Sequence, residues 1–244
     1  DIEGVIAHGS VAVVYRAYDH VLKLRVALKE YLPEALVMRS GATQLVLRER
    51  EHAPCFERGR QAFVHEARIL AHCQHPALPR VVRMLHQHGT AYRVMRLCAG
   101  PTLLEHCRGR ATARDATALR GWVDHLLGAL AELHGLGLVH GAVSPAKILM
   151  VPGHGPVLMS SQAVRAALLS GSTRGLMAWL EPGFMPIEQR DPASERPLGP
   201  WTDLYALAAT LRYYIGGPPP AALPAHGSAD APADTPAGIA SLGA

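Results

Sequence analysis

The stretch that decides the fold runs from residue 138 to residue 149 and reads LVHGAVSPAKIL. Apolar residues flank a short polar loop that contains His140, Pro145 and Lys147. This loop lies inside a run of 48 residues, 133 to 180, without a single Asp or Glu. Carboxylates act in enzymes as general bases and as magnesium ligands. The run therefore offers neither function.

Hydrophobic periodicity divides the chain into a strand-rich front half and a helical back half. Apolar residues alternate around Val11, Val13 and Tyr15, which is typical of strands. Further strands are expected at 26–28, 81–85 and 91–97, and helices at 63–74 and 116–134. This order predicts an α+β protein of two lobes.

The expected domain boundaries follow from these elements. The first lobe covers residues 1–97 and the second covers 98–215. Within the first lobe, a polar insert at 33–61 is either a hairpin flap or a mobile loop. In the segment 216–244, 20 of the 29 residues are Gly, Pro or Ala, so we expect it to be flexible.

Composition excludes several classes of function. The 244 residues are 49% apolar and 18% charged, and no run approaches the ~20 apolar residues of a membrane span. The net charge of +4 comes from scattered basic residues with few aromatics, so no nucleic-acid partner is expected. Four cysteines without a C-x-x-C pair indicate reduced thiols and no thiol metal site. We expect a cytoplasmic chain, with any membrane anchor lying outside it.

Six short motifs occur in a fixed order along the chain. They are IAHGSVAVVY at 6–15, VALK at 26–29, AYRVMRLC at 91–98, the loop at 138–149, PGFMPIEQ at 182–189 and WTDLYAL at 201–207. Taken together, they resemble the protein kinase superfamily, and the bacterial serine/threonine kinases in particular. The resemblance implies a two-lobed kinase fold with a strand-rich N-lobe and a helical C-lobe. The last helices of the family's C-lobe are not recognisable, so we expect that lobe to be shortened.

The resemblance also implies a nucleotide site. Lys29 matches the family's phosphate-pairing lysine, Glu66 its ion-pair partner, and Met95 the gatekeeper next to the adenine. The remaining positions implied for nucleotide binding are Gly9, Val14, Ala27, Cys98 and Leu149. Gly9 is the one glycine that remains of the family's phosphate-covering loop, since Ala7 and Ala12 replace the other two.

Three positions depart from the family's catalytic pattern. Ala142 stands where the family has its catalytic base, and Lys147 replaces the metal-binding asparagine. Ser160 replaces the magnesium-binding aspartate. From the resemblance we therefore expect no catalytic residue and no metal site, and either no cofactor or ATP bound without magnesium.

These departures lead to a functional expectation with two alternatives. The expectation is an inactive pseudokinase that serves as a scaffold for a protein partner, namely a kinase, a phosphoprotein or a secretion or signalling component. The first alternative is an unusual nucleotide-binding serine/threonine kinase or transferase that works without the usual magnesium site, with Lys147 and Lys29 neutralising the phosphates. The second is a structural domain whose pocket is filled by its own side chains.

Overall fold

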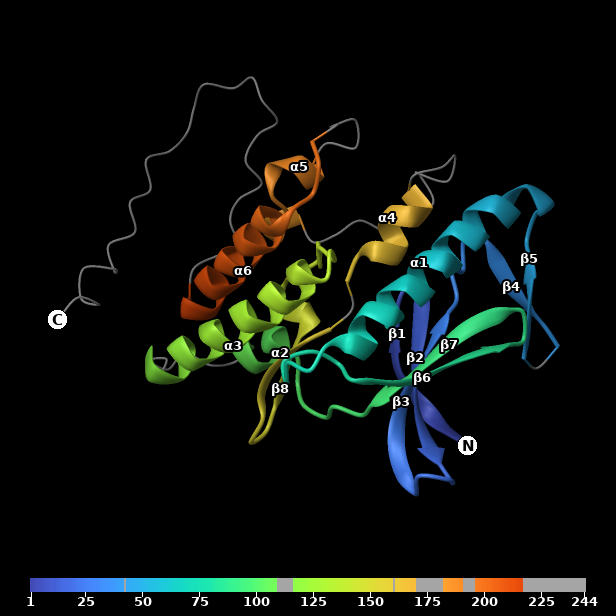
Figure 1. Ribbon diagram of the computed structural model, residues 1–244, viewed down its shortest axis with the longest axis horizontal. Helices are drawn as coiled ribbons and strands as arrows, with labels where there is room; N and C mark the ends of the chain where they lie inside the picture. Colours follow the sequence, from blue (N-terminus) through green and yellow to red (C-terminus); the bar gives the residue numbers. More distant parts are fainter. Residues whose placement is uncertain (42, 109–115, 160, 170–181, 191–195, 217–244) are drawn as a thin grey trace.

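The computed structural model describes residues 1–41, 43–108, 116–159, 161–169, 182–190 and 196–216. Figure 1 shows a strand-rich lobe beside a helical lobe, which is the two-lobed α+β architecture that the sequence predicts. Ser160 and the predicted flexible segment beyond Gly216 lie outside the described residues. In the described part of the chain, no helix is both long enough and apolar enough to cross a membrane.

The N-lobe is built on one antiparallel sheet of five strands in the order β1-β2-β3-β7-β6. The strands are β1 (Ile2–His8), β2 (Ala12–Asp19), β3 (Leu24–Tyr31), β6 (Val81–Gln87) and β7 (Thr90–Arg96). Residues directly opposite each other in an antiparallel pair point to the same face. Val14 and Arg93 both lie opposite Lys29, and Met95 lies opposite Ala27. All five side chains therefore share one face.

Helix α1 (Ala53–His72) packs across that face, where the guanidinium of Arg93 lies 5.2 Å from the centre of the fully buried Phe63 ring. The helix begins well before the predicted start at Phe63. Pro54 occupies its first turn, a position that proline favours because the missing N–H has no partner there anyway. Part of the polar insert is thus helical.

The rest of the insert forms a hairpin, which is the first of the two forms that the sequence left open. Strands β4 (Val37–Ser40) and β5 (Gln44–Leu47) pair antiparallel, and a short 3₁₀ turn, η1 (Arg50–His52), leads into α1. Leu36, Val37 and Leu45 are buried in the core of the N-lobe. This apolar burial explains why the insert folds back onto the sheet.

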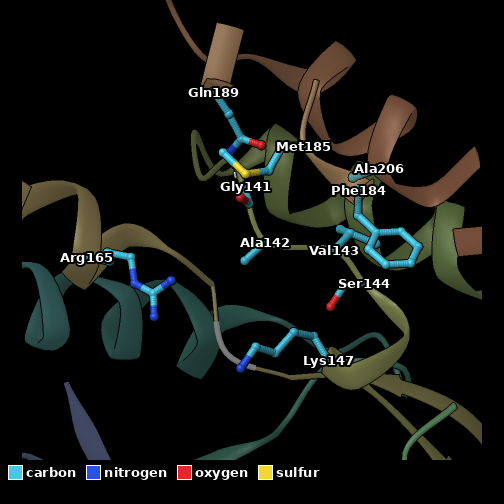
Figure 2. A pocket seen from close by; sticks show the side chains of 10 residues that line it. All are labelled: Gly141, Ala142, Val143, Ser144, Lys147, Arg165, Phe184, Met185, Gln189 and Ala206. Atoms are coloured by element: carbon cyan, nitrogen blue, oxygen red, sulfur yellow. Dashed lines mark hydrogen bonds between the residues drawn. The ribbon is translucent and has the colours of Figure 1, made fainter. Parts of the chain in front are cut away.

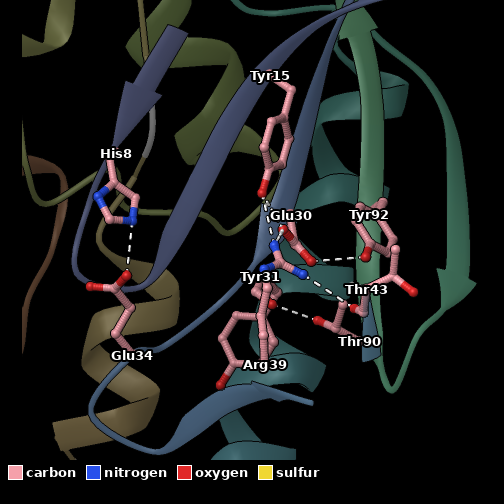
Figure 3. Close-up of polar contacts among 9 residues, drawn as sticks. All are labelled: His8, Tyr15, Glu30, Tyr31, Glu34, Arg39, Thr43, Thr90 and Tyr92. Carbon is pink, nitrogen blue, oxygen red and sulfur yellow. Dashed lines mark hydrogen bonds and ion pairs between the residues drawn. The ribbon is translucent and has the colours of Figure 1, made fainter. Parts of the chain in front are cut away.

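A buried carboxylate ties the hairpin to the second face of the sheet (Figure 3). Glu30 is 1% exposed, and its Oε2 lies 2.6 Å from Nη2 of Arg39 in β4. Tyr15 donates a hydrogen bond of 2.6 Å to the same oxygen, and Tyr92 donates one of 2.8 Å to Oε1. These bonds offset the cost of burying the charge.

The C-lobe surrounds a second core. Its elements are α2 (Leu103–Cys107), α3 (Ala116–Gly135), η2 (Pro145–Lys147), β8 (Ile148–Val151), β9 (Gly155–Leu158), η4 (Pro182–Phe184), α5 (Ile187–Arg190) and α6 (Pro200–Ile215). Leu130 of α3, Ile148 of β8 and Leu207 of α6 meet in this core. A third apolar cluster, which includes Leu70 of α1 and Leu133 of α3, joins the two lobes.

Helix α4 (Ala163–Leu169) lies against α1 (Figure 1). Val164 and Leu168 are buried in the core of the N-lobe, although they follow the C-lobe strands in sequence. Gly59 of α1 permits this approach, because a Cβ there would collide with the Leu168 side chain and the Tyr31 hydroxyl. The segment after β9 is thus anchored in the N-lobe.

We predict that Leu168→Ala lowers the free energy of unfolding by about 2–5 kcal/mol, because it removes a fully buried side chain and leaves a cavity between α4 and α1. Urea unfolding measures the change. The matched control is Leu204→Ala on α6, where the leucine is 48% exposed and the expected change is about 0.5 kcal/mol or less. Equal losses in both variants would show that α4 does not pack as described.

Candidate functional site

The loop at 138–149 is held from below by one buried carboxylate. Asp203 of α6 is 0% exposed and accepts the backbone N–H of Gly141 at 2.6 Å through Oδ1. Its Oδ2 accepts the backbone N–H of His140 at 2.8 Å and lies 2.8 Å from Nε2 of His134. Three groups thus satisfy the buried charge and fix the loop's path.

Two further features set the loop's conformation. The backbone N–H of Ala142 lies 3.3 Å from Nδ1 of His140, so Nδ1 is the acceptor and Nε2–H donates to the Met159 carbonyl at 3.2 Å. Burial lowers the pKa of His140, which is consistent with this neutral ring. Gly141 has φ +66°, a left-handed conformation that glycine adopts without strain.

A small cavity of about 120 Å³ opens above this loop (Figure 2). It is lined by Gly141, Ala142, Val143, Ser144, Lys147, Arg165, Phe184, Met185, Gln189 and Ala206. None of these described residues is an acid, whereas Lys147 and Arg165 are cations. The cavity is therefore electropositive and suited to an anion.

Magnesium does not fit this set of side chains. The ion prefers octahedral oxygen ligands, usually including carboxylates. The cavity offers the Ser144 hydroxyl and backbone carbonyls, together with two cations that repel a divalent ion. Ser160, which with Lys147 occupies one of the family's two metal-ligand positions, lies outside the described residues.

The expected ion pair between Lys29 and Glu66 is replaced by another. Oε2 of Glu66 lies 2.8 Å from Nη1 of Arg93, and both side chains are 1% exposed. Oε1 accepts a hydrogen bond of 2.7 Å from the Ser161 hydroxyl and one of 3.1 Å from its backbone N–H. The carboxylate thus joins α1, β7 and the segment before α4. Among the described residues its ion pair is with Arg93, and the charge of Lys29 still lowers its pKa.

The pKa values in this cluster follow from burial and charge. Burial raises the pKa of Glu66, but the charges of Arg93 and Lys29 and the Ser161 hydroxyl outweigh it and lower the pKa to about 2. Burial also lowers the pKa of Lys29 to about 7, and the charges of Arg93 and Lys147 add to this against the opposing field of Glu66. Burial and these two cations thus disfavour the charged form of Lys29.

Three of the other residues predicted to bind nucleotide share a sheet face with Lys29, and the remaining three lie on other elements. Val14, Ala27 and Met95 share the sheet face with Lys29. Leu149 lies on β8 and bridges to Thr102. Cys98 follows β7 with an intermediate exposure, and Gly9 lies in the turn between β1 and β2, where its N–H donates to the Ala12 carbonyl at 3.0 Å.

Two residues of the site were missed at the level of sequence. Arg93 alternates with Ala91 and Met95 in an apolar strand, and this alternation by itself indicates an inward-facing charge. Arg165 is a cation in the run that lacks acids, but no spacing rule links it to Lys147 or to the glycine loop. Only the packing of α4 against α1 brings it into the cleft.

Comparisons with known proteins identify the family. A solved structure of PpkA-294 in its apo form, PpkA being a bacterial serine/threonine kinase, matches with a TM-score of 0.78 and 35% sequence identity over 90% of this chain and 76% of that chain. The chain belongs to the protein kinase superfamily. The PknI kinase domain of Mycobacterium tuberculosis shares the fold, with a TM-score of 0.63 and 18% identity over 90% of this chain and 75% of that chain.

Curated relatives of this kinase-family chain carry kinase names. The DNA damage-responsive serine/threonine-protein kinase RqkA of Deinococcus radiodurans is 28% identical over 90% of this chain and 30% of that protein. Calcium/calmodulin-dependent protein kinase type 1B of Rattus norvegicus is 29% identical over 67% of this chain and 47% of that protein. The chain thus spans about half the length, or less, of these relatives. No family model matches it.

These comparisons overturn the expectation of an inactive, non-enzymatic scaffold. Both curated relatives are named as protein kinases, RqkA as a serine/threonine-protein kinase, and nothing in the described residues shows inactivity. The alternative, a nucleotide-binding kinase without the usual magnesium site, fits better. The expectation was wrong because it weighed the missing acids alone, although phosphoryl transfer depends mainly on positioning and on charge stabilisation. The cations of the cleft can supply that charge.

We predict that Glu66→Gln lowers the free energy of unfolding by about 3–5 kcal/mol at pH 7, because Arg93 is then buried without a partner charge. The folded pKa of about 2 lies below the ordinary 4.5, so the carboxylate stabilises the fold above about pH 4.5 and loses this effect as the pH falls towards 2. The gap between wild type and variant should therefore shrink over that window. Urea unfolding at a series of pH values measures it.

A second carboxylate on α1 provides the matched control. Glu57 pairs with Arg60 at 2.8 Å, and its side chain is 42% exposed. Glu57→Gln should cost about 1 kcal/mol or less, since water screens an exposed pair. A cost for Glu66→Gln no larger than this, or one that does not change with pH, would contradict the buried ion pair.

Proposed function

We propose that this chain is a serine/threonine protein kinase that binds ATP through side-chain cations in place of a magnesium site. The observation that carries the proposal is the electropositive cavity, in which Lys147 and Arg165 lie beside Ala142 and Ser144 with no described acid in the lining. The names of the relatives support the reaction class.

The positions of the cations support this assignment. Lys29 lies on the cleft face of the sheet, and Lys147 is close enough for its charge to lower the pKa of Lys29. The positive charge of Lys147 disfavours the charged form of Lys29. A polyphosphate between the two ammonium groups offsets this effect, so the same charges that are unfavourable without a ligand favour ATP.

The adenine end of the nucleotide has a matching surface. Val14 and Ala27 lie on the cleft face of β2 and β3, and Leu149 lies on β8 of the other lobe. Such apolar groups on two sides suit a flat base, while the backbone after Met95 supplies hydrogen-bonding groups. We assign the acceptor as a Ser or Thr hydroxyl of a protein, in line with the name of the relative RqkA.

The transfer step forms one bond to phosphorus and breaks one. The acceptor oxygen forms a bond to the γ-phosphorus, the bond from that phosphorus to the β,γ-bridging oxygen breaks, and ADP leaves. Ala142 has no basic group, so the proton of the hydroxyl passes to water. A positioned base contributes about 10²–10⁴-fold. The expected rate lies below the ~1–100 s⁻¹ of typical kinases by that factor.

Transfer of labelled γ-phosphate from ATP to a generic protein substrate tests the proposal. Slow incorporation should persist in EDTA and be lost in Lys29→Ala and Lys147→Ala, because each variant removes a phosphate-binding charge. Lys23→Asn is the matched control: this exposed lysine has φ 52°, which asparagine tolerates, so incorporation should be unchanged. No incorporation by the wild type, or incorporation that EDTA abolishes, would refute the proposal.

We also predict that Ala142→Asp raises the rate, by up to about 10²–10⁴-fold, because it places a carboxylate at the base position beside the cavity. The measurement is the same labelled transfer in EDTA. Ala146→Asp adds an equal charge on η2 outside the lining and should have a much smaller effect. An equal response of the two variants would show that the acceptor does not approach Ala142.

A further inference from the structure

The guanidinium of Arg165 brings a positive charge into the cavity above the loop at 138–149. Arg165 is partly buried and lines the cavity above the loop at 138–149. In the described part of the chain, its hydrogen bond is long, with 3.3 Å between Nη2 and the Ser10 hydroxyl in the turn between β1 and β2. No ion pair joins it to any acid among the described residues.

Such a charge is unfavourable unless a ligand completes it. Removing a guanidinium from water without a partner acid penalises its charged form, and burial lowers the pKa of Arg165 accordingly. Arginine still carries its charge at neutral pH, because its ordinary pKa lies far above 7. One neutral hydroxyl at 3.3 Å does not offset the loss of hydration. An anion would.

The backbone that carries Arg165 is packed against the N-lobe. Val164 and Leu168, on the same short helix, are buried in the core of the N-lobe. From this helix, the side chain reaches the Ser10 hydroxyl of the turn between β1 and β2. Figure 2 shows it in the cavity that Ser144 also lines. A fixed guanidinium favours phosphate, whose oxygens it can bind in a bidentate manner.

We propose that Arg165 binds the terminal phosphate of ATP, a role that rests on the function proposed above. The role of Arg165 differs from that of Lys29 because the two residues lie in different places. Lys29 is buried on the sheet face. Arg165 lines the cavity that also holds Ala142 and Ser144, which is the side from which an acceptor hydroxyl must approach. The phosphate that lies next to the acceptor is the one that is transferred. The Ser10 hydroxyl accepts a hydrogen bond from the same guanidinium that we assign to that phosphate.

Calorimetric titration of the whole chain in EDTA, with ATP and with ADP, tests this role. The wild type should bind ATP about tenfold or more tightly than ADP, because only ATP reaches Arg165 with a charge-assisted contact. Arg165→Gln should bind the two nucleotides with equal affinity. Lys29→Ala should instead weaken both by a similar factor. Arg212→Gln, which removes an exposed arginine on α6, should behave as the wild type does.

Each outcome separates the two proposals. An unchanged preference for ATP in Arg165→Gln, or tighter ATP binding by that variant, overturns the role of Arg165 and leaves the proposed kinase function standing. A wild type that binds ATP and ADP equally well does the same. A wild type that binds neither nucleotide overturns both proposals. Urea unfolding of Arg165→Gln shows that the variant is folded before it is titrated.

Discussion

The arrangement of helix, sheet and cleft depends on the buried carboxylate of Glu66 and its contacts. It belongs to α1, it pairs with Arg93 of β7 at 2.8 Å, and it accepts two hydrogen bonds from Ser161 just before α4. Helix, sheet and the segment after β9 are thus fixed to one another by a single charged group. Because both ions are almost fully buried, loss of either leaves an uncompensated charge in the interior.

The Glu66–Arg93 ion pair also affects the net charge of the cleft. Among the described residues, the ion pair of Glu66 is with Arg93 and not with Lys29. The described lining of the cavity above the loop at 138–149 contains no acid. Lys29, Lys147 and Arg165 remain as the positive groups of the cleft. The same arrangement that makes a divalent cation unfavourable makes a polyphosphate favourable, since both effects have one electrostatic origin.

The functional correction follows from this balance. Missing acids in a sequence show which chemical groups are absent from familiar positions, and they say nothing of the groups that other elements bring in. Arg165 reaches the cleft because α4 is anchored by Leu168 in the core of the other lobe. Kinases accelerate transfer mainly by positioning and charge stabilisation, so a cleft rich in cations remains compatible with the family's reaction.

The sequence by itself predicted the main strands of the first lobe, the helices at 63–74 and 116–134 and the two-lobed α+β arrangement, because periodicity acts over short distances. The loop at 138–149 was identified through the resemblance of its residues to a known family. The sequence also indicated that residue 142 cannot serve as a base. It did not determine the start of α1, the choice between hairpin and loop in the insert, or the partner of Glu66. Those features depend on which apolar surfaces and charges meet in the folded chain. The Glu66 carboxylate could pair with Lys29 or with Arg93, and only the packing of α1 against the sheet decides that Arg93 is its partner.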